Sequence, residues 1–376
     1  MDREDRSLRE GVSSPTRRDI LRSTAVGAVT PVVAAAGCVS SSAPTLGREL
    51  DRRRSDGRPD APSRVLASDP GESVSADAVE TVREATLRTH STRERGLIGE
   101  NPAGGNDRLL AYGLRLEGGA PVEYRYTIDS DAPSGAVETA RERARDRLRR
   151  FERGAVSTGL VAESPWKTLG TIFHTAAAWE ADEVVGEVEH NYHGTEVPAA
   201  AGTGDGTTAF ALAAEVVLRP GRGGPFAGRF GNHEASIRQD WARSDHEYRE
   251  LTCSPVGDDT TTYDTDLAVT VSTDGGRVGI SVDGGRVRQH DESGAYPVDS
   301  TVHHRWGFPG LWACDGVRCR PVVVGNVGRV ETEPPTADAV AFCPAELRAA
   351  FSNPDGRVAV VHTSLSPTLS DLDSYD

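Results

Sequence analysis

Residues 108–129 read RLLAYGLRLEGGAPVEYRYTID, two arms of alternating residues around a pair of glycines. Apolar side chains recur at every second position of both arms, a period that is typical of β-strands. Gly118 and Gly119 supply the backbone freedom that a tight turn requires. The apolar positions are Leu110, Tyr112, Leu114 and Leu116 in the first arm and Val122, Tyr124, Tyr126 and Ile128 in the second. The stretch therefore predicts an antiparallel β-hairpin in which each arm has an apolar side.

Helices are predicted on both sides of this hairpin in the sequence. From Ser134 to about Phe151, apolar residues recur every three or four positions, which makes one stripe along a helix. From Ser75 to His90 a second helix is predicted, with Ser75 as its N-cap. Helices of this kind bury their stripe against a sheet. The first half is therefore expected to be α+β, an antiparallel sheet with covering helices.

The rest of the chain is expected to be rich in strands. Strands are predicted over residues 168–175, 184–192 and 208–218, and again over residues 321–330 and 357–362, with one short helix from Pro344 to Phe351. A Gly/Pro-rich stretch at residues 220–231 suggests a boundary. We therefore expect an α+β domain over residues 64–219, a mostly β domain over residues 232–366, and an acidic tail over residues 367–376 that frays.

The charge of the chain indicates the salt concentration in which the protein works. The 376 residues carry a formal net charge of −15, and Lys167 is the only lysine among the 42 basic residues. An acidic surface with arginine in place of lysine is typical of proteins that work in molar salt, where the Debye length is only about 3 Å. A GC-rich genome, which favours arginine codons, is the alternative explanation. The net charge argues against nucleic-acid binding, which needs an excess of basic side chains.

The first 37 residues have the order of an export signal. Arg17 and Arg18 are followed by an apolar, alanine-rich segment that is too short to span a bilayer, and the segment ends at Gly37 before Cys38. Together these features resemble the signals of haloarchaeal lipoproteins exported through the twin-arginine pathway. The resemblance implies that the export machinery recognises Arg17 and Arg18, and that the chain is cleaved before Cys38. Ordinary cleavage after Ala36 is the alternative.

The same resemblance implies a lipid on Cys38, which would anchor the protein at the extracytoplasmic face of the cell membrane. Residues 38–63 are rich in Ser, Pro, Gly and Arg, and we interpret them as a flexible tether. The resemblance covers the N-terminal region only and says nothing about the fold or activity of the rest.

Four further cysteines lie in the second half of the chain. Because an exported protein meets oxidising conditions, disulfides are the first interpretation. Cys314 and Cys319 flank a predicted hairpin tip and would pair across it, which leaves Cys253 and Cys343 as the second bridge. Free buried thiols and a zinc site remain alternatives, although a second short-spaced cysteine pair is missing.

A candidate ligand-binding segment precedes Cys314. The stretch HHRWGFPGLW, residues 303–312, concentrates rings in a Gly/Pro-rich context, and rings of this kind form platforms for stacking or cation–π contacts. The residues concerned are His303, His304, Trp306, Phe308 and Trp312. The competing interpretation is a loop whose rings pack into the core.

Two classes of function remain open from the sequence. We find no nucleophile elbow, no phosphate-binding loop and no cofactor motif, so no catalytic residue is assigned. The first hypothesis is a lipid-anchored surface protein of a halophile that has a binding or structural role, with a small solute or a protein as partner. The alternative is an exported hydrolase or metal-dependent enzyme whose site assembles from scattered His and carboxylate residues, with Asp245, His246 and Glu247 as candidates.

Overall fold

The computed structural model describes residues 63–372 with internal gaps. The gaps are 91–94, 105, 156–159, 163–165, 198–207, 222–229, 244–247, 255–261, 264–268, 273–274, 279–286, 291–292, 297–298, 310–317, 320 and 333–338. The predicted signal peptide and nearly all of the predicted tether lie outside the described residues, as do Cys38, Trp312 and Cys314. All described residues belong to one compact unit, Asp56–Asp376.

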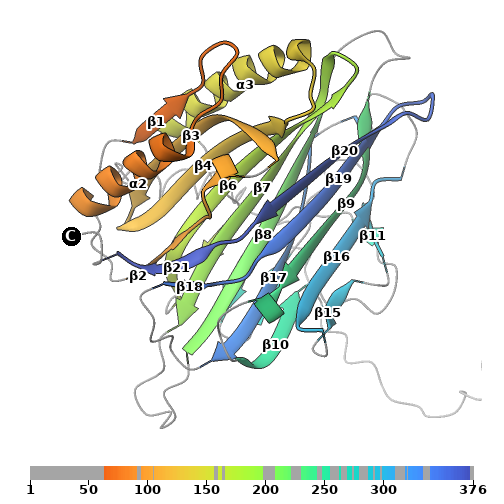
Figure 1. The fold of residues 1–376 in the computed structure, drawn as a ribbon. Coiled ribbons are helices and arrows are strands. Elements are labelled where there is room, and N and C mark those ends of the chain that lie inside the picture. Colours follow the sequence, from red (N-terminus) through yellow and green to blue (C-terminus); the bar gives the residue numbers. More distant parts are fainter. Residues whose placement is uncertain are drawn as a thin grey trace, which may run out of the picture. The chain divides into compact units, whose positions relative to one another are not determined.

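The described elements are mainly β-strands (Figure 1). The α-helices are α2 (Ala76–His90) and α3 (Ser134–Glu152), and short 3-10 turns are η2 (Pro102–Gly104) and η4 (Trp241–Arg243). The strands of the first half are β1 (Arg64–Ala67), β2 (Arg95–Ile98), β3 (Asp107–Glu117), β4 (Ala120–Asp129), β5 (Leu160–Ala162), β6 (Lys167–Glu180), β7 (Glu183–Val197) and β8 (Thr208–Pro220). Those of the second half are β9 (Gly231–Asp240), β10 (Tyr248–Ser254), β11 (Thr262–Tyr263), β12 (Val269–Ser272), β13 (Gly275–Val278), β14 (Val287–Gln289), β15 (Gly294–Tyr296), β16 (Thr301–Gly307), β17 (Val322–Thr332), β18 (Ala339–Ala341), β19 (Ala345–Ser352), β20 (Val358–Leu365) and β21 (Thr368–Asp371).

The predicted hairpin is confirmed and lies in the larger of the two main sheets. β3 and β4 pair in antiparallel register around Gly118 and Gly119, whose φ angles are +56° and +77°. The large sheet has the strand order β1-β3-β4-β6-β7-β8-β17-β10. One feature of the hairpin was not expected. Its polar positions are buried as well as its apolar ones, because both faces of the sheet are covered in this region.

Helix α3 covers one face of the large sheet. It connects β4 to β6, which run parallel to each other, and parallel neighbours need such a crossover connection. The predicted stripe is confirmed, since Leu148 and Phe151 are buried with the rest of it and the Phe151 ring stacks on Tyr124 at 5.5 Å. Rings and aliphatic groups of this size each contribute about 1.5–3 kcal/mol when buried, so this stripe fixes α3 on the sheet.

The opposite face of the large sheet packs against a second sheet. This second sheet has the strand order β11-β14-β16-β9-β19-β20, with β15 beside β16. The largest apolar cluster lies between the two sheets and includes Trp241, Trp306 and Phe342. Figure 1 shows β9, β19 and β20 running over the large sheet on this side. The architecture here is therefore a sandwich of two sheets.

Beside the second sheet, on the same face of the large one, lie α2 and a small sheet. Helix α2 packs on Tyr112 and Leu114 of β3, and the Ala78 N–H donates to Ser75 Oγ at 3.3 Å, as expected for the N-cap. The small sheet has the order β18-β21-β2. It pairs β21, near the C-terminus, with β2, the strand that follows α2 in the sequence.

Three expectations about the fold need correction. The chain is mostly β and not α+β with covering helices, since one face of the large sheet is covered mainly by a second sheet. The predicted helix at residues 344–351 is instead strand β19 (Ala345–Ser352), which pairs with β9 on one side and β20 on the other. The segment from residue 367 does not simply fray, because Thr368–Asp371 pairs with β2 and buries Leu369.

The two expected domains share the large sheet. β8 from the first half pairs with β17 from the second half over eleven residue pairs, from Val322–Leu218 to Thr332–Thr208. The boundary expected near residues 220–231 therefore does not separate two sheets, because strands from both sides of it pair in the large sheet.

Candidate functional site

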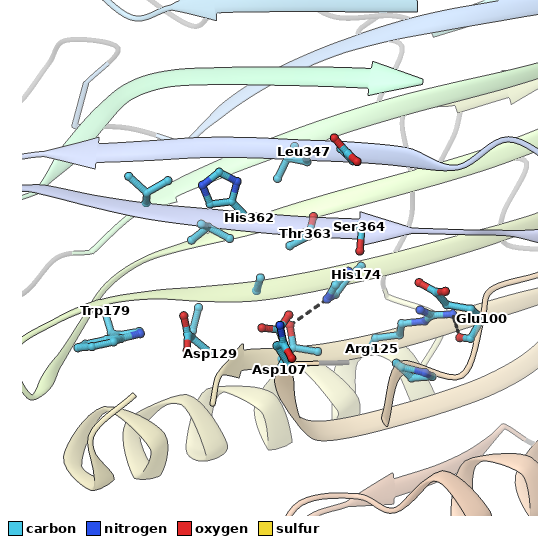
Figure 2. Close-up of a pocket in the computed structure, with 18 of the residues that line it drawn as sticks. Glu100, Asp107, Arg125, Asp129, His174, Trp179, Leu347, His362, Thr363 and Ser364 are labelled. Carbon is cyan, nitrogen blue, oxygen red and sulfur yellow. Dashed lines mark hydrogen bonds between the residues drawn. The ribbon is translucent and has the colours of Figure 1, made fainter. Parts of the chain in front are cut away.

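A cavity of about 690 Å³ opens where the second sheet ends above the large one (Figure 2). β20 is the last strand of the second sheet, and it lies over β6 while β4 extends beyond it. The region of η2 closes the far side. The lining residues are Glu100, Asn101, Pro102, Asn106, Asp107, Arg125, Thr127, Asp129, His174, Ala176, Ala177, Trp179, Glu346, Leu347, Val360, Val361, His362, Thr363 and Ser364.

The floor of the cavity is the face of the large sheet. β4 contributes every second residue, Arg125, Thr127 and Asp129, as expected for a strand seen face-on. The parallel pairing of β4 with β6 places His174 beside Arg125. These β4 positions alternate with the apolar ones of the predicted hairpin, and they form the polar lining of the cavity.

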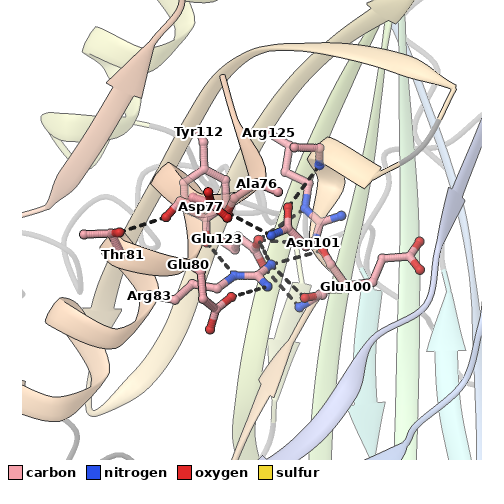
Figure 3. Close-up of polar contacts among 12 residues, drawn as sticks. Ala76, Asp77, Glu80, Thr81, Arg83, Glu100, Asn101, Tyr112, Glu123 and Arg125 are labelled. Carbon is pink, nitrogen blue, oxygen red and sulfur yellow. Dashed lines mark hydrogen bonds and ion pairs between the residues drawn. The ribbon is translucent and has the colours of Figure 1, made fainter. Parts of the chain in front are cut away.

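A buried ion cluster holds one end of this floor in place (Figure 3). Glu123 is completely enclosed, and its Oε1 accepts hydrogen bonds from Arg83 Nη2 at 2.8 Å and from Arg125 Nη2 at 3.1 Å. Its Oε2 accepts from the Gly99 N–H at 3.0 Å. Burial by itself raises the pKa of Glu123, but Arg125 and Arg83 outweigh it and hold that pKa below the usual value. The carboxylate is therefore ionised.

Gly99 and Glu100 complete the cluster. A Cβ on Gly99 would stand 1.7 Å from Arg125 Nη2, so only glycine leaves room for this guanidinium. Arg125 also donates to the Glu100 carbonyl at 2.7 Å, and Arg83 donates to the Gly99 carbonyl at 2.8 Å. The cluster thus ties helix α2, the loop after β2 and strand β4 together, and it fixes Arg125 at the cavity.

Carboxylates dominate the charge of the lining. Asp107 and Asp129 are direct partners across β3 and β4, and Glu100 and Glu346 contribute two more acidic groups. Burial, followed by the charge of Asp129, raises the pKa of Asp107. Because these four carboxyl groups share the lining with the single guanidinium of Arg125, the cavity presents a surplus of acidic groups.

His174 is a buried polar side chain of the floor. It is 4% exposed, its Nε2 lies 2.9 Å from Thr127 Oγ1, and its Nδ1 contacts no hydrogen-bonding group among the described residues. Burial, with a smaller contribution from Arg125, lowers the pKa of His174 to about 3. The ring is therefore neutral and has one nitrogen unused. No three His, Cys, Asp or Glu side chains in the described regions are grouped as metal ligands.

The expected ring platform is not formed by the residues that the structure describes. His303, His304 and Trp306 belong to strand β16 and not to a loop, and the His304 and Trp306 rings stack at 5.7 Å inside the core. Trp306, His304 and Phe308 are at most 1% exposed, which puts them beyond the reach of a ligand. His303 is half-buried on the other face of the strand, and Trp312 lies outside the described part. The competing interpretation, rings packed into the core, fits these positions.

The cysteines show no disulfide among the described residues. Cys253 and Cys343 are separate thiols, half-buried and buried respectively. Burial raises the pKa of Cys253 to about 11 and that of Cys343 well above its usual value, so neither is a reactive thiolate. The Cys314–Cys319 bridge stays a prediction, because Cys314 lies outside the described residues.

A smaller cavity of about 260 Å³ lies under α3 on the other face of the large sheet. Two of its lining arginines, Arg147 and Arg219, meet acidic partners within the protein. Arg147 contacts Glu187 and Glu189, and Arg219 Nε donates to Glu189 at 3.0 Å. Arg147 of α3 therefore has a structural role at this cavity.

Sequence comparison adds no assignment. No protein-family model matches the chain, and no match was found among curated proteins. One sequence signal was available for the cavity. Asp107 and Asp129 stand at the two ends of the predicted hairpin, eleven and ten residues from its glycine pair, and the bulge between Leu109 and Ala111 accounts for the difference. The hairpin therefore implied that the two carboxyl groups lie near each other, whereas their direct opposition depends on the bulge.

Proposed function

We propose that this protein is an exported, lipid-anchored binding protein of a halophile, and that the cavity between β20 and β4 is its ligand site. One observation carries the proposal. A cavity of about 690 Å³, lined by both apolar walls and convergent polar groups, falls within the size range of ligand-binding sites in proteins. Its polar groups come from separate elements that the Glu123 cluster holds together, so the site is preformed.

The cellular part of the proposal depends on the N-terminal sequence. Arg17 and Arg18 direct export, and the lipid on Cys38 retains the protein at the outer face of the membrane. In the described part of the chain, no helix has both the length and the apolar character for crossing a bilayer.

The experiment is a ligand survey by thermal shift in molar KCl, on the purified full-length chain and two variants. Ser364 is exposed and lines the cavity, so Ser364→Trp obstructs the site without disturbing the core. Val358→Trp is the matched control, since Val358 is exposed on the same strand outside the lining. A ligand at 100 times its Kd stabilises the folded state by about 2.7 kcal/mol.

We expect such a ligand to raise the Tm of the wild type and of the Val358→Trp control by several degrees, and to leave the Ser364→Trp Tm unchanged. Equal shifts in all three proteins would place binding elsewhere and contradict the proposal.

One observation favours a second candidate, an exported hydrolase. Asp107 has a raised pKa and lies directly across from a second carboxyl group, Asp129, and many hydrolases use two carboxyl groups as general acid and general base. Under this candidate Asp107→Asn would abolish turnover of a substrate without weakening its binding. Binding without turnover, in wild type and variant alike, supports the first candidate.

A further inference from the structure

The wall that β20 gives to the cavity differs in kind from the floor. Five consecutive residues, Val360 to Ser364, line the cavity. A strand seen face-on contributes every second residue, as β4 does, whereas a strand seen from its edge contributes all of them. The cavity therefore borders the edge of β20, where main-chain N–H and C=O groups project.

This edge is open. β20 is terminal in the strand order, and in the described part of the chain its backbone pairs with β19 alone between Val360 and Ser364. Proteins usually protect such an edge with charged residues, proline or a bulge, since it attracts further strands. Here Val360 stands on the strand with 40% of its surface exposed, and the pairing with β19 is free of bulges. The edge lacks the usual protection.

The floor next to this edge is acidic and has an unused polar group. Asp107 and Asp129 give it negative charge, and the enclosed His174 keeps its Nδ1 without a partner among the described residues. Trp179, which is partly exposed, adds apolar contact area. A ligand that fits must offer main-chain hydrogen bonds on one side and basic side chains toward the floor.

We infer that the ligand is an extended peptide segment with alternating basic and apolar residues, which adds as a strand to the edge of β20. This inference rests on the proposed function, because it assigns the ligand class of the same cavity. The added strand directs alternate side chains to the floor, where the carboxylates meet basic groups, and the others away from it. The five lining residues of β20 correspond to about 17 Å of strand, so about five peptide residues pair.

The test uses fluorescein-labelled heptapeptides and anisotropy in 1 M KCl. The parent peptide alternates lysine and valine, and the charge control alternates glutamate and valine. Two further peptides carry N-methyl groups on all lysines or on all valines, so that each loses the N–H donors of one edge only. We expect the parent to bind, the glutamate peptide to bind at least tenfold more weakly, and one methylated peptide to lose affinity.

The expected loss follows from the number of missing bonds. A main-chain hydrogen bond contributes about a factor of five to the binding constant, so two lost bonds weaken binding about 25-fold. The peptide methylated on the other edge stays within about threefold of the parent. Equal behaviour of the two methylated peptides would overturn the inference, and so would preference for the glutamate peptide.

Protein variants give an independent reading. Val360→Lys places a charge on the open edge and is expected to lower the affinity for the parent peptide at least tenfold. Tyr296→Lys, at an exposed position on β15, is the matched control and leaves affinity unchanged. If a small solute binds and Ser364→Trp abolishes its binding while no peptide binds, this inference fails and the proposed function stands. If neither solute nor peptide binding responds to Ser364→Trp, both fail.

Discussion

Replacement of Glu123 by glutamine is predicted to destabilise the protein strongly. The side chain is enclosed and receives hydrogen bonds from two guanidinium groups and one backbone N–H. Glu123→Gln keeps the size of the side chain but leaves Arg125 without the carboxylate that opposes it, and leaves Arg83 with only Glu80, at 3.7 Å. Removing one partner of a buried ion pair costs about 3–5 kcal/mol, since the remaining charge stays buried.

This loss of stability predicts a measurable decrease in Tm. Unfolding entropy is about 2.1 cal/mol/K per residue, which gives about 0.6 kcal/mol/K for a folded unit of about 300 residues. A loss of about 4 kcal/mol therefore lowers Tm by about 6 °C. The assay is thermal unfolding followed by circular dichroism in molar KCl. Because the pair is buried, salt screens it little and the effect persists at high ionic strength.

The pH dependence of the effect has a definite sign. The native pKa of Glu123 is lowered, since Arg125 and Arg83 outweigh the effect of burial. A lowered acid pKa adds stability that is complete above the unfolded value of about 4.3 and is lost as pH falls through the native value. The difference in stability between wild type and Glu123→Gln is therefore full at pH 6 and shrinks below about pH 4.

A surface pair and a double variant serve as controls. Glu180 lies 3.8 Å from Arg357 in an exposed ion pair, so Glu180→Gln is expected to change stability by less than about 0.5 kcal/mol. Glu123→Leu combined with Arg83→Met removes one charge of each sign and should cost less than Glu123→Gln alone. A Tm for Glu123→Gln within 1 °C of the Glu180→Gln Tm would refute the account of the cluster.

Three further predictions concern the sequence features. Arg17→Lys together with Arg18→Lys should trap the precursor inside the cell, and normal export of this variant would exclude the twin-arginine pathway. Cys38→Ser should release soluble protein into the medium, as seen by fractionation and immunoblot, and a variant that stays tightly bound to membranes would count against lipidation. Stability should be lower in dilute buffer than in molar KCl, because the net charge of −15 repels itself more strongly when unscreened, and a Tm that does not respond to salt would contradict the halophile interpretation.

Local patterns predicted the local parts of the fold. The hairpin of β3 and β4 and the buried stripe of α3 follow from periods of two and of three to four residues. Residues 344–351 misled the same reasoning, because Ala, Glu, Leu and Arg favour helix. Their place between β9 and β20 overrides that preference, and β9 lies more than a hundred positions away in the sequence.

The cavity was beyond sequence reasoning for a related reason. Glu123 and Arg125 alternate with tyrosines, a pattern that usually marks a strand with one face in water. They are buried because Arg83, forty positions before Glu123, reaches them from α2. A buried ion cluster built from distant segments has no spacing that a sequence reveals. The rings of residues 303–308 show the opposite error. They stand out in the sequence as a candidate binding site, but in the structure Trp306 and Phe308 belong to the hydrophobic core.

The position of the cavity follows from the number of strands in the two sheets. The large sheet continues past β6 to β4, β3 and β1, whereas the second sheet stops at β20. After β20 the chain turns away and enters the small sheet as β21, beside β2. Helix α2 covers β3, so β4 is left with a gap above it. One additional strand beside β20 would close this gap. The gap therefore has the position that the next strand of the second sheet would occupy. For this reason an extended peptide fits the gap better than a compact solute does.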